Sequence, residues 1–232
     1  SQLLSKEYAA SRAATSDANH ATPSTELDEE PAAINEGDNT THFSIVDRDG
    51  NRVAATLSIN TPFGSGFVAG ETGLLLNNEM DDFSVAPDAP NAYRLRSHSG
   101  NEIAPGKRPL SSMSPVFVED ERGILILGTP GGSRIISTIL LAVLDYADQP
   151  QIDLQAMLRA QRYHHQYLPD RVEIEPEGFS QEWIAKLQAR GHVVTKSNRR
   201  WGNMQAVYIG KRSGHAQAAN DPRGQGGGLG WY

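Results

Sequence analysis

Thr40 stands where an acidic segment meets the first β-like run of the chain, within Gly-Asp-Asn-Thr-Thr-His-Phe at 37–43. If the bond before Thr40 is cut, the new terminus carries a hydroxyl nucleophile. It also carries an α-amine, whose ordinary pKa of about 7.7 to 8.0 lets it act as the base. The alternatives are a strand that begins with two β-formers, or a glycosylation acceptor at Asn39-Thr40-Thr41. Composition alone leaves these interpretations open.

Two further polar clusters suit the charged ends of an amino acid. Residues 77–83, Asn-Asn-Glu-Met-Asp-Asp-Phe, follow an apolar run, and carboxylates beside amides suit an ammonium group. A calcium loop is the alternative, but its alternating ligands and late bidentate Glu are missing. Ser111 and Ser112 lie between Pro109 and Pro115, which restrict the backbone so that the hydroxyls can face a carboxylate. An ordinary turn would also account for the serine pair.

Gly131 and Gly132 join a β-like run to the longest helical pattern. Backbone N–H groups at a helix N-terminus bind a phosphate or stabilise an oxyanion. Residues 128–134 lack the Gly-Lys-Ser/Thr ending of a phosphate loop, which favours the oxyanion; a packing role is the alternative. His164 and His165 are expected to be structural, because neighbours at a helix end do not share a face. We therefore expect neither a metal nor a cofactor.

The composition is that of an ordinary globular protein, with 232 residues, 38% of them apolar and 21% charged. The absence of Cys excludes disulfides, thiolate metal sites and cysteine nucleophiles. The longest apolar run, 135–144, is interrupted by Ser137 and Thr138 and is shorter than the roughly 18 residues of a membrane span. The net charge of −7 argues against nucleic-acid binding. No signal peptide is expected in this chain.

The chain divides at Thr40. Residues 1–14 predict a helix too short to be stable alone, which should pack on something else. Residues 15–39 are acidic, contain two prolines and carry few large apolar side chains, so they predict an exposed linker. The linker ends abruptly where the β-like pattern begins, which is what a processing site would require.

Residues 40–232 predict an α+β fold with mainly antiparallel pairing. A buried hairpin is expected from 42–46 and 53–60 around a turn at 47–51. The residues 83–109 predict a long loop of the kind that is usually functional. The other expected strands are 73–76, 115–118, 123–127, 192–196 and 204–209, and the expected helices are 133–146, 153–161 and 180–191.

These residues resemble the small subunit of γ-glutamyltranspeptidase from about Thr40 to the C-terminus, while 1–39 resembles the tail of the large subunit with its processing linker. The likeness implies an N-terminal nucleophile hydrolase whose precursor cleaves itself between Asn39 and Thr40. The two subunits would share one αββα sandwich. The motifs that carry it are 40–44, 77–84, 109–115, 130–134 and 218–223, with the terminal Tyr232.

The resemblance also implies roles for individual residues. Thr40 would cleave the precursor and then accept the acyl group. Ser58 would hydrogen-bond Thr40 from a position where the family usually has Thr. The remaining roles would be the α-amino site at Asn60, Glu79 and Asp82, the α-carboxylate site at Ser111 and Ser112, the oxyanion site at the N–H groups of Gly131 and Gly132, and a lid at Tyr93.

The implied reaction transfers the γ-glutamyl group of glutathione or another γ-glutamyl amide to water, an amino acid or a peptide. The implied partner is the large subunit, which supplies an Arg, so the fragment alone should have little or no activity. A bacterial protein of this kind would be periplasmic or secreted. Alternatives are a related amidohydrolase of the cephalosporin acylase or polyglutamate-processing type, and an inactive, unprocessed interaction module.

Overall fold

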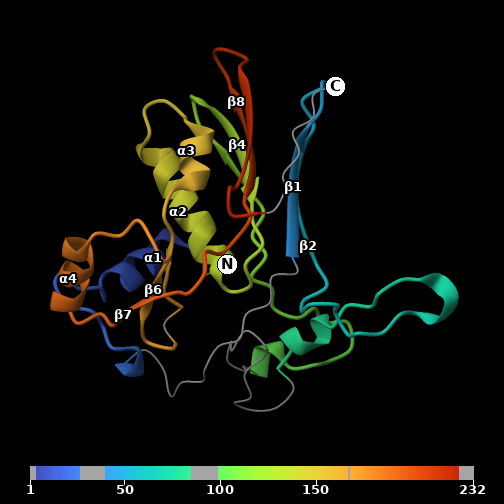
Figure 1. The fold of residues 1–232 in the computed structure, drawn as a ribbon, viewed down its shortest axis with the longest axis horizontal. Helices are drawn as coiled ribbons and strands as arrows, with labels where there is room; N and C mark the ends of the chain where they lie inside the picture. Colours follow the sequence, from blue (N-terminus) through green and yellow to red (C-terminus); the bar gives the residue numbers. More distant parts are fainter. Residues whose placement is uncertain (1–3, 27–39, 85–98, 167, 225–232) are drawn as a thin grey trace.

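The centre of the molecule is a four-stranded antiparallel sheet in the order β3–β4–β8–β9. The computed structural model describes residues 4–26, 40–84, 99–166 and 168–224. Every residue of β4 is buried, because helices cover one face of the sheet and a hairpin covers the other (Figure 1). The four strands are β3 (Val116–Glu119), β4 (Gly123–Gly128), β8 (Gln205–Gly210) and β9 (Ala216–Asn220).

Two helices, α2 (Arg134–Asp148) and α3 (Leu154–Arg159), form the first layer. The apolar side chains of α2 recur every three or four residues, which is the spacing of one helix face. That face, including Ile135, Ile139 and Tyr146, packs with Leu125 and Leu127 of β4 in the main core. The predicted helices 133–146, 153–161 and 180–191 are thereby confirmed, the third as α4 (Gln181–Ala189).

The hairpin of β1 (Thr40–Val46) and β2 (Arg52–Ser58) packs against the other face of the sheet (Figure 1). Thr40, His42 and Ser44 of β1 turn inward, with His42 buried, while Phe43 and Ile45 face outward and are 40% and 49% exposed. The expectation of a buried hairpin is therefore only half correct. The physical reason is that no layer within the described residues covers the outer face.

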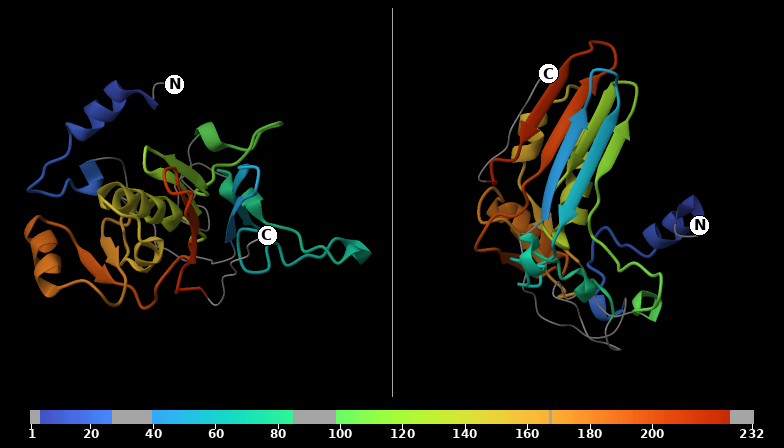
Figure 2. Two further views of the ribbon diagram at one scale, coloured as in Figure 1. Left: turned by 90° about the horizontal axis from the view of Figure 1, so that it is seen from above. Right: turned by 90° about the vertical axis from the view of Figure 1, so that its right-hand side faces the viewer.

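A smaller sheet, β5–β6–β7, lies at the other side of the α2 layer, beside α4 and the N-terminal segment (Figures 1 and 2). Its strands β6 and β7 are parallel, unlike the other pairs. The N-terminal helix α1 (Lys6–Ala13) has no buried residue. The predicted linker is not exposed throughout, because Ser24 is buried in this region. The strands are β5 (Tyr163–His164), β6 (Val172–Ile174) and β7 (Val194–Lys196).

Two predictions from the sequence are wrong. The expected strand at 73–76 is not formed: the run pairs locally with 65–69 through an isolated bridge between Val68 and Leu75 and a few backbone hydrogen bonds, in an arm that extends from the body (Figure 2). An apolar run forms a stable strand only when a neighbouring sheet pairs with it, and the described residues provide none here. His164 lies in β5 and not at a helix end. The physical reason is that β6 pairs with this segment, with Tyr163 opposite Ile174 and His164 opposite Glu173.

The long loop predicted at 83–109 is described only in part. Its residues 99–109 include a single short 3-10 helix at Ser99–Asn101. The predicted lid residue, Tyr93, lies outside the described residues. In the part of the chain that is described, no helix has both the length and the apolar character needed to cross a bilayer.

We expect Gly128→Ala to destabilise the protein, because the added Cβ would lie 2.2 Å from Nδ1 of buried His42. Overpacking of this kind costs about 1–3 kcal/mol. Urea unfolding measures the change, and Gly100→Ala is the matched control because a Cβ there meets no atom within 4 Å. Equal unfolding midpoints for the two variants would show that the hairpin can move away from β4.

Candidate active site

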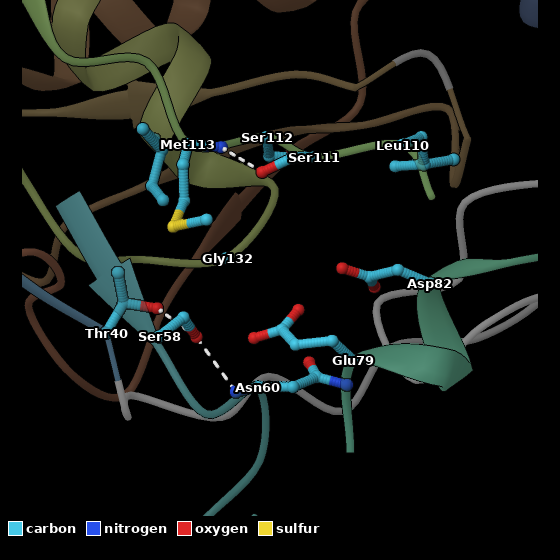
Figure 3. Close-up of a pocket in the computed structure, with 11 residues that line it drawn as sticks. Thr40, Ser58, Asn60, Glu79, Asp82, Leu110, Ser111, Ser112, Met113 and Gly132 are labelled. Carbon is cyan, nitrogen blue, oxygen red and sulfur yellow. Dashed lines mark hydrogen bonds between the residues drawn. The ribbon is translucent and has the colours of Figure 1, made fainter. Parts of the chain in front are cut away.

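One pocket of about 340 Å³ collects most of the predicted site residues. It lies between the ends of β1 and β2, the turn before α2, the 3-10 helix η4 (Glu79–Asp82) and the segment 110–113 (Figure 3). Gly131 precedes a lining residue but does not itself line the pocket, and Tyr93 is outside the described residues. The predicted residues that line it are Thr40, Ser58, Asn60, Glu79, Asp82, Ser111, Ser112 and Gly132.

A hydrogen-bonded row of polar groups runs along one wall of the pocket (Figure 3). The register of the hairpin places Thr40 opposite Ser58, and Thr40 Oγ1 donates to Ser58 Oγ at 3.1 Å. Ser58 Oγ also accepts the N–H of Asn60 at 2.8 Å. Asn60 has a left-handed φ of 70°, and its Nδ2 donates to the carbonyl of Asn78 at 3.1 Å. The end of β2 therefore connects the Thr40 hydroxyl to the segment that leads into η4.

Glu79 and Asp82 turn their carboxylates into the pocket from η4 (Figure 3). Within the described part of the chain, the buried Oε1 of Glu79 has no hydrogen-bond partner. A buried carboxylate oxygen without a partner is costly, so it favours a ligand that brings a positive charge or a donor. The two carboxylates can therefore receive an ammonium group.

Ser111 and Ser112 lie on the wall that faces Glu79 and Asp82 (Figure 3). Ser111 Oγ accepts the N–H of Met113 at 3.2 Å. The N–H of Leu110 donates to Oδ1 of Asn101 at 2.9 Å, which ties the segment to the loop before it. The Ser111 hydroxyl is thus held in place, and both serine side chains line the pocket, where a hydroxyl can donate to a carboxylate.

Gly131 and Gly132 form the turn that opens α2, with φ values of 141° and 54° that favour glycine. Their carbonyl oxygens accept the N–H groups of Arg134 and Ile135. Arg134 is itself fixed, since its guanidinium donates to Glu173 at 2.6 Å and lies over the Trp201 ring. The first N–H groups of a helix have no partner within it, so this turn can supply donors to an anion at the pocket.

His42 is a residue of this region that sequence reasoning missed. Its Nδ1 lies 2.8 Å from Thr56 Oγ1, and its Nε2 lies 3.0 Å from Ser44 Oγ. Burial lowers the pKa of His42 to about 4, so the imidazole is neutral at pH 7. Ser44 in turn donates to the carbonyl of Ile126 in β4 at 3.3 Å. The sequence feature that could have identified His42 is its position two residues after Thr40, which puts both side chains on the same face of a strand.

His164, which the sequence predicts to be structural, is held by hydrogen bonds within the fold. Its Nδ1 lies 2.8 Å from Ser137 Oγ, and its Nε2 lies 2.9 Å from Gln166 Oε1. Gln166 also accepts the hydroxyl of Ser133 at the start of α2. The imidazole therefore supports the turn that opens the helix.

A family model described as Gamma-glutamyltranspeptidase matches residues 1–231. The chain belongs to the γ-glutamyltranspeptidase family. It is 45% identical over 222 residues to the glutathione hydrolase proenzyme of Escherichia coli, covering 95% of this chain and 38% of that protein. It is 39% identical over 230 residues to the corresponding proenzyme of Pseudomonas sp., covering 95% of this chain and 40% of that protein. The chain thus spans about two fifths of the length of these relatives.

Solved structures agree with this family membership. A γ-glutamyltranspeptidase from Pseudomonas nitroreducens complexed with L-DON superposes with a TM-score of 0.72 at 40% identity, covering 83% of this chain and 100% of that one. The transpeptidase CapD of Bacillus anthracis superposes with a TM-score of 0.63 at 25% identity, covering 82% and 99%. The expected N-terminal nucleophile hydrolase fold is therefore confirmed.

The lowered pKa of His42 predicts a stability that falls on acidification. Between the folded pKa of about 4 and the ordinary value of 6.5, the unfolded state binds the proton and the folded state does not. Lowering the pH from 7 to 5 should therefore cost on the order of 2 kcal/mol through this group. His42→Gln should remove that part of the loss in urea unfolding.

The control is His215→Gln, since His215 is exposed. It should leave the loss between pH 7 and pH 5 as large as in the unmodified protein. The assignment to His42 is wrong if His42→Gln keeps the full loss as well.

Proposed function

We propose that this chain forms the catalytic part of a γ-glutamyltranspeptidase or glutathione hydrolase, with Thr40 as its nucleophile after a cut between Asn39 and Thr40. The observation that carries the proposal is the single pocket that contains the Thr40 hydroxyl, a carboxylate pair and a serine pair. Membership of the family supports it. We assign residues 1–39 to the end of the large subunit and 40–232 to the small subunit.

Self-cleavage needs only groups of this chain and water. The Thr40 hydroxyl attacks the carbonyl carbon of Asn39, and the C–N bond breaks as the Thr40 nitrogen gains a proton. Water then hydrolyses the resulting ester, which releases the Asn39 carboxylate and returns the Thr40 hydroxyl beside a free α-amine. The product combines nucleophile and base in one residue.

In turnover, the α-amine of Thr40 accepts the hydroxyl proton while Oγ1 attacks the γ-carbonyl of the substrate. Ser58, which accepts from Thr40 in the resting hydrogen bond, can donate its own proton to Oγ1 as negative charge develops there. The N–H groups of Gly131 and Gly132 stabilise the oxyanion, and each donor of this kind is worth on the order of 10²-fold in rate. The leaving amine takes the proton, and water or an acceptor amine then removes the acyl group.

The walls of the pocket match a γ-glutamyl head group. Glu79 and Asp82, with Asn60 beside them, would bind the α-amino group. Ser111 and Ser112 would bind the α-carboxylate, together with an Arg from the large subunit. This assignment leaves the γ-carbonyl to extend toward Thr40.

The large subunit is the proposed partner, and the isolated fragment would have little or no activity without it. The proenzyme names of the relatives, and the two fifths of their length that this chain spans, support the partnership. The acceptors would be water, amino acids or peptides. We propose a periplasmic or secreted location.

Two alternatives make different demands on the site. A cephalosporin acylase substrate with a glutaryl side chain has no ammonium group to place beside the buried Oε1 of Glu79, which favours a glutamyl substrate. The likeness to CapD supports a transpeptidase on the same fold. An interaction module would need no cut before Thr40, so whether the bond between Asn39 and Thr40 is cut distinguishes a module from an enzyme.

Thr40→Ala should leave the precursor as one chain, because no hydroxyl remains to attack the bond before residue 40. Intact-mass spectrometry of the complete precursor should show two chains for the unmodified protein, the smaller beginning at Thr40. Thr41→Ala is the control, since Thr41 is exposed and should not affect the cut. Cleavage of the Thr40→Ala protein at this bond would remove Thr40 from the mechanism.

In the complete processed enzyme, Glu79→Gln should raise the KM for a γ-glutamyl anilide by about 10- to 100-fold, the usual worth of a hydrogen bond to a charged group. A glutaryl anilide, which lacks the α-amino group, should lose far less. The exposed Glu71→Gln serves as control. Equal effects on the two substrates would show that Glu79 does not bind the amino group.

A further inference from the structure

The segment 21–24, within the predicted linker 15–39, is hydrogen-bonded to the body of the chain. The N–H of Ala21 donates to the carbonyl of Arg190 at 2.6 Å, and the N–H of Ser24 donates to Oδ2 of Asp170 at 2.7 Å. Ser24 is 1% exposed, and it is the only buried side chain described among residues 4–26. The segment is therefore attached through a defined contact, although α1 before it buries nothing.

The Asp170 carboxylate accepts a hydrogen bond from this segment. Its Oδ2 faces Ser24, and its Oδ1 lies 3.2 Å from Nε2 of His165. Burial alone would raise the pKa of Asp170, but hydrogen bonds from Ser24 and His165 outweigh it and lower the pKa. The His165 ring packs edge-on against His192, which follows the α4 helix. His165 thus holds the second carboxylate oxygen of Asp170 while the first accepts the tail.

The contact between Ser24 and Asp170 lies away from the start of β1, which matters for the proposed cut before Thr40. The N-terminal segment lies beside α4 and β7, whereas β1 begins at the other side of the molecule (Figure 1). The fifteen residues 25–39 join the two anchored points, a length that can reach at most about 50 Å. Before a cut, the contact fixes the upstream end of residues 25–39. After a cut, the covalent connection to Thr40 is gone, and only non-covalent contacts such as these hydrogen bonds can hold the tail.

We propose that Asp170 and the carbonyl of Arg190 form a receptor for the tail of the upstream subunit. The receptor would anchor the processing linker in the precursor and keep the tail on the small subunit after cleavage. The second half of this inference rests on the proposed cut before Thr40. The first half does not, because it concerns the uncut chain.

Amide hydrogen exchange of the complete precursor tests the receptor at the Ala21 and Ser24 amides. Asp170→Ala removes the acceptor for Ser24. Ser24→Pro removes the donor from the tail and leaves residues 40–224 unchanged; proline suits the first position of a helical turn. Asp148→Ala is the matched control, because Asp148 is an exposed carboxylate at the end of α2.

Both amides should be protected in the unmodified protein before and after processing, and equally in the Asp148→Ala protein. In Asp170→Ala, exchange at Ser24 should be at least about tenfold faster. In Ser24→Pro, exchange at Ala21 should accelerate in the same way. Unchanged protection at Ser24 in the Asp170→Ala protein would overturn the receptor. If Asp170→Ala does not fold, unchanged protection at Ala21 in the Ser24→Pro protein would overturn it instead. Loss of protection upon cleavage would overturn the retention of the tail.

The uncut Thr40→Ala precursor separates this inference from the proposed function. Protection of both amides in it supports the receptor, whether or not the unmodified chain is cut. If the unmodified precursor is never cut before Thr40, the proposed function fails, and retention after cleavage fails with it. If it is cut but its tail is unprotected in both forms, only the receptor fails.

Discussion

The register between β1 and β2 is the constraint on which the site depends. It places Thr40 opposite Ser58, and a slip by one residue would turn Thr40 to the outer face of the hairpin. The turn at 47–51 fixes that register, because Oδ1 of Asp47 accepts the N–H groups of Asp49 and Asn51. Gly50 supplies the left-handed φ of 83° that closes the turn. A local turn about ten residues away thereby determines where the Thr40 hydroxyl points.

His42 connects this hairpin to the rest of the proposed machinery. It contacts Thr56 and Ser44 within the hairpin and lies directly against Gly128 at the end of β4. Three residues beyond Gly128, the chain reaches Gly131 and Gly132. The close contact between imidazole and glycine therefore sets the spacing between the Thr40 strand and the turn that we propose as the oxyanion site. A neutral, buried imidazole suits this role, because a charge there would have to be desolvated.

The exposed apolar surface of the chain agrees with the proposed subunit arrangement. Phe43 and Ile45 face outward from β1, and Ile136, Leu140 and Leu144 form an exposed stripe on α2. Surfaces of this kind mark contacts with other polypeptide. The relatives are about two and a half times as long as this chain, so the remainder of such a protein is sufficient to cover both faces. The tail contact at Asp170 adds a polar connection between the same two parts.

The sequence by itself determined the features that depend on nearby residues. The first strand, predicted over 42–46 and observed from Thr40, the hairpin turn and the spacing of apolar residues along α2 are local signals, and the helices follow them closely. The motifs around Glu79, Ser111 and Gly131 supported a resemblance that the family model confirms.

The tertiary structure decided everything that depends on pairing across the chain. It left the apolar run 73–76 outside the sheets that the described residues form, and it placed His164 in a short strand. It also buried His42 against Gly128 and bound Ser24 to Asp170 across 146 residues of sequence. No local pattern encodes these contacts, because each depends on how distant segments pack against one another.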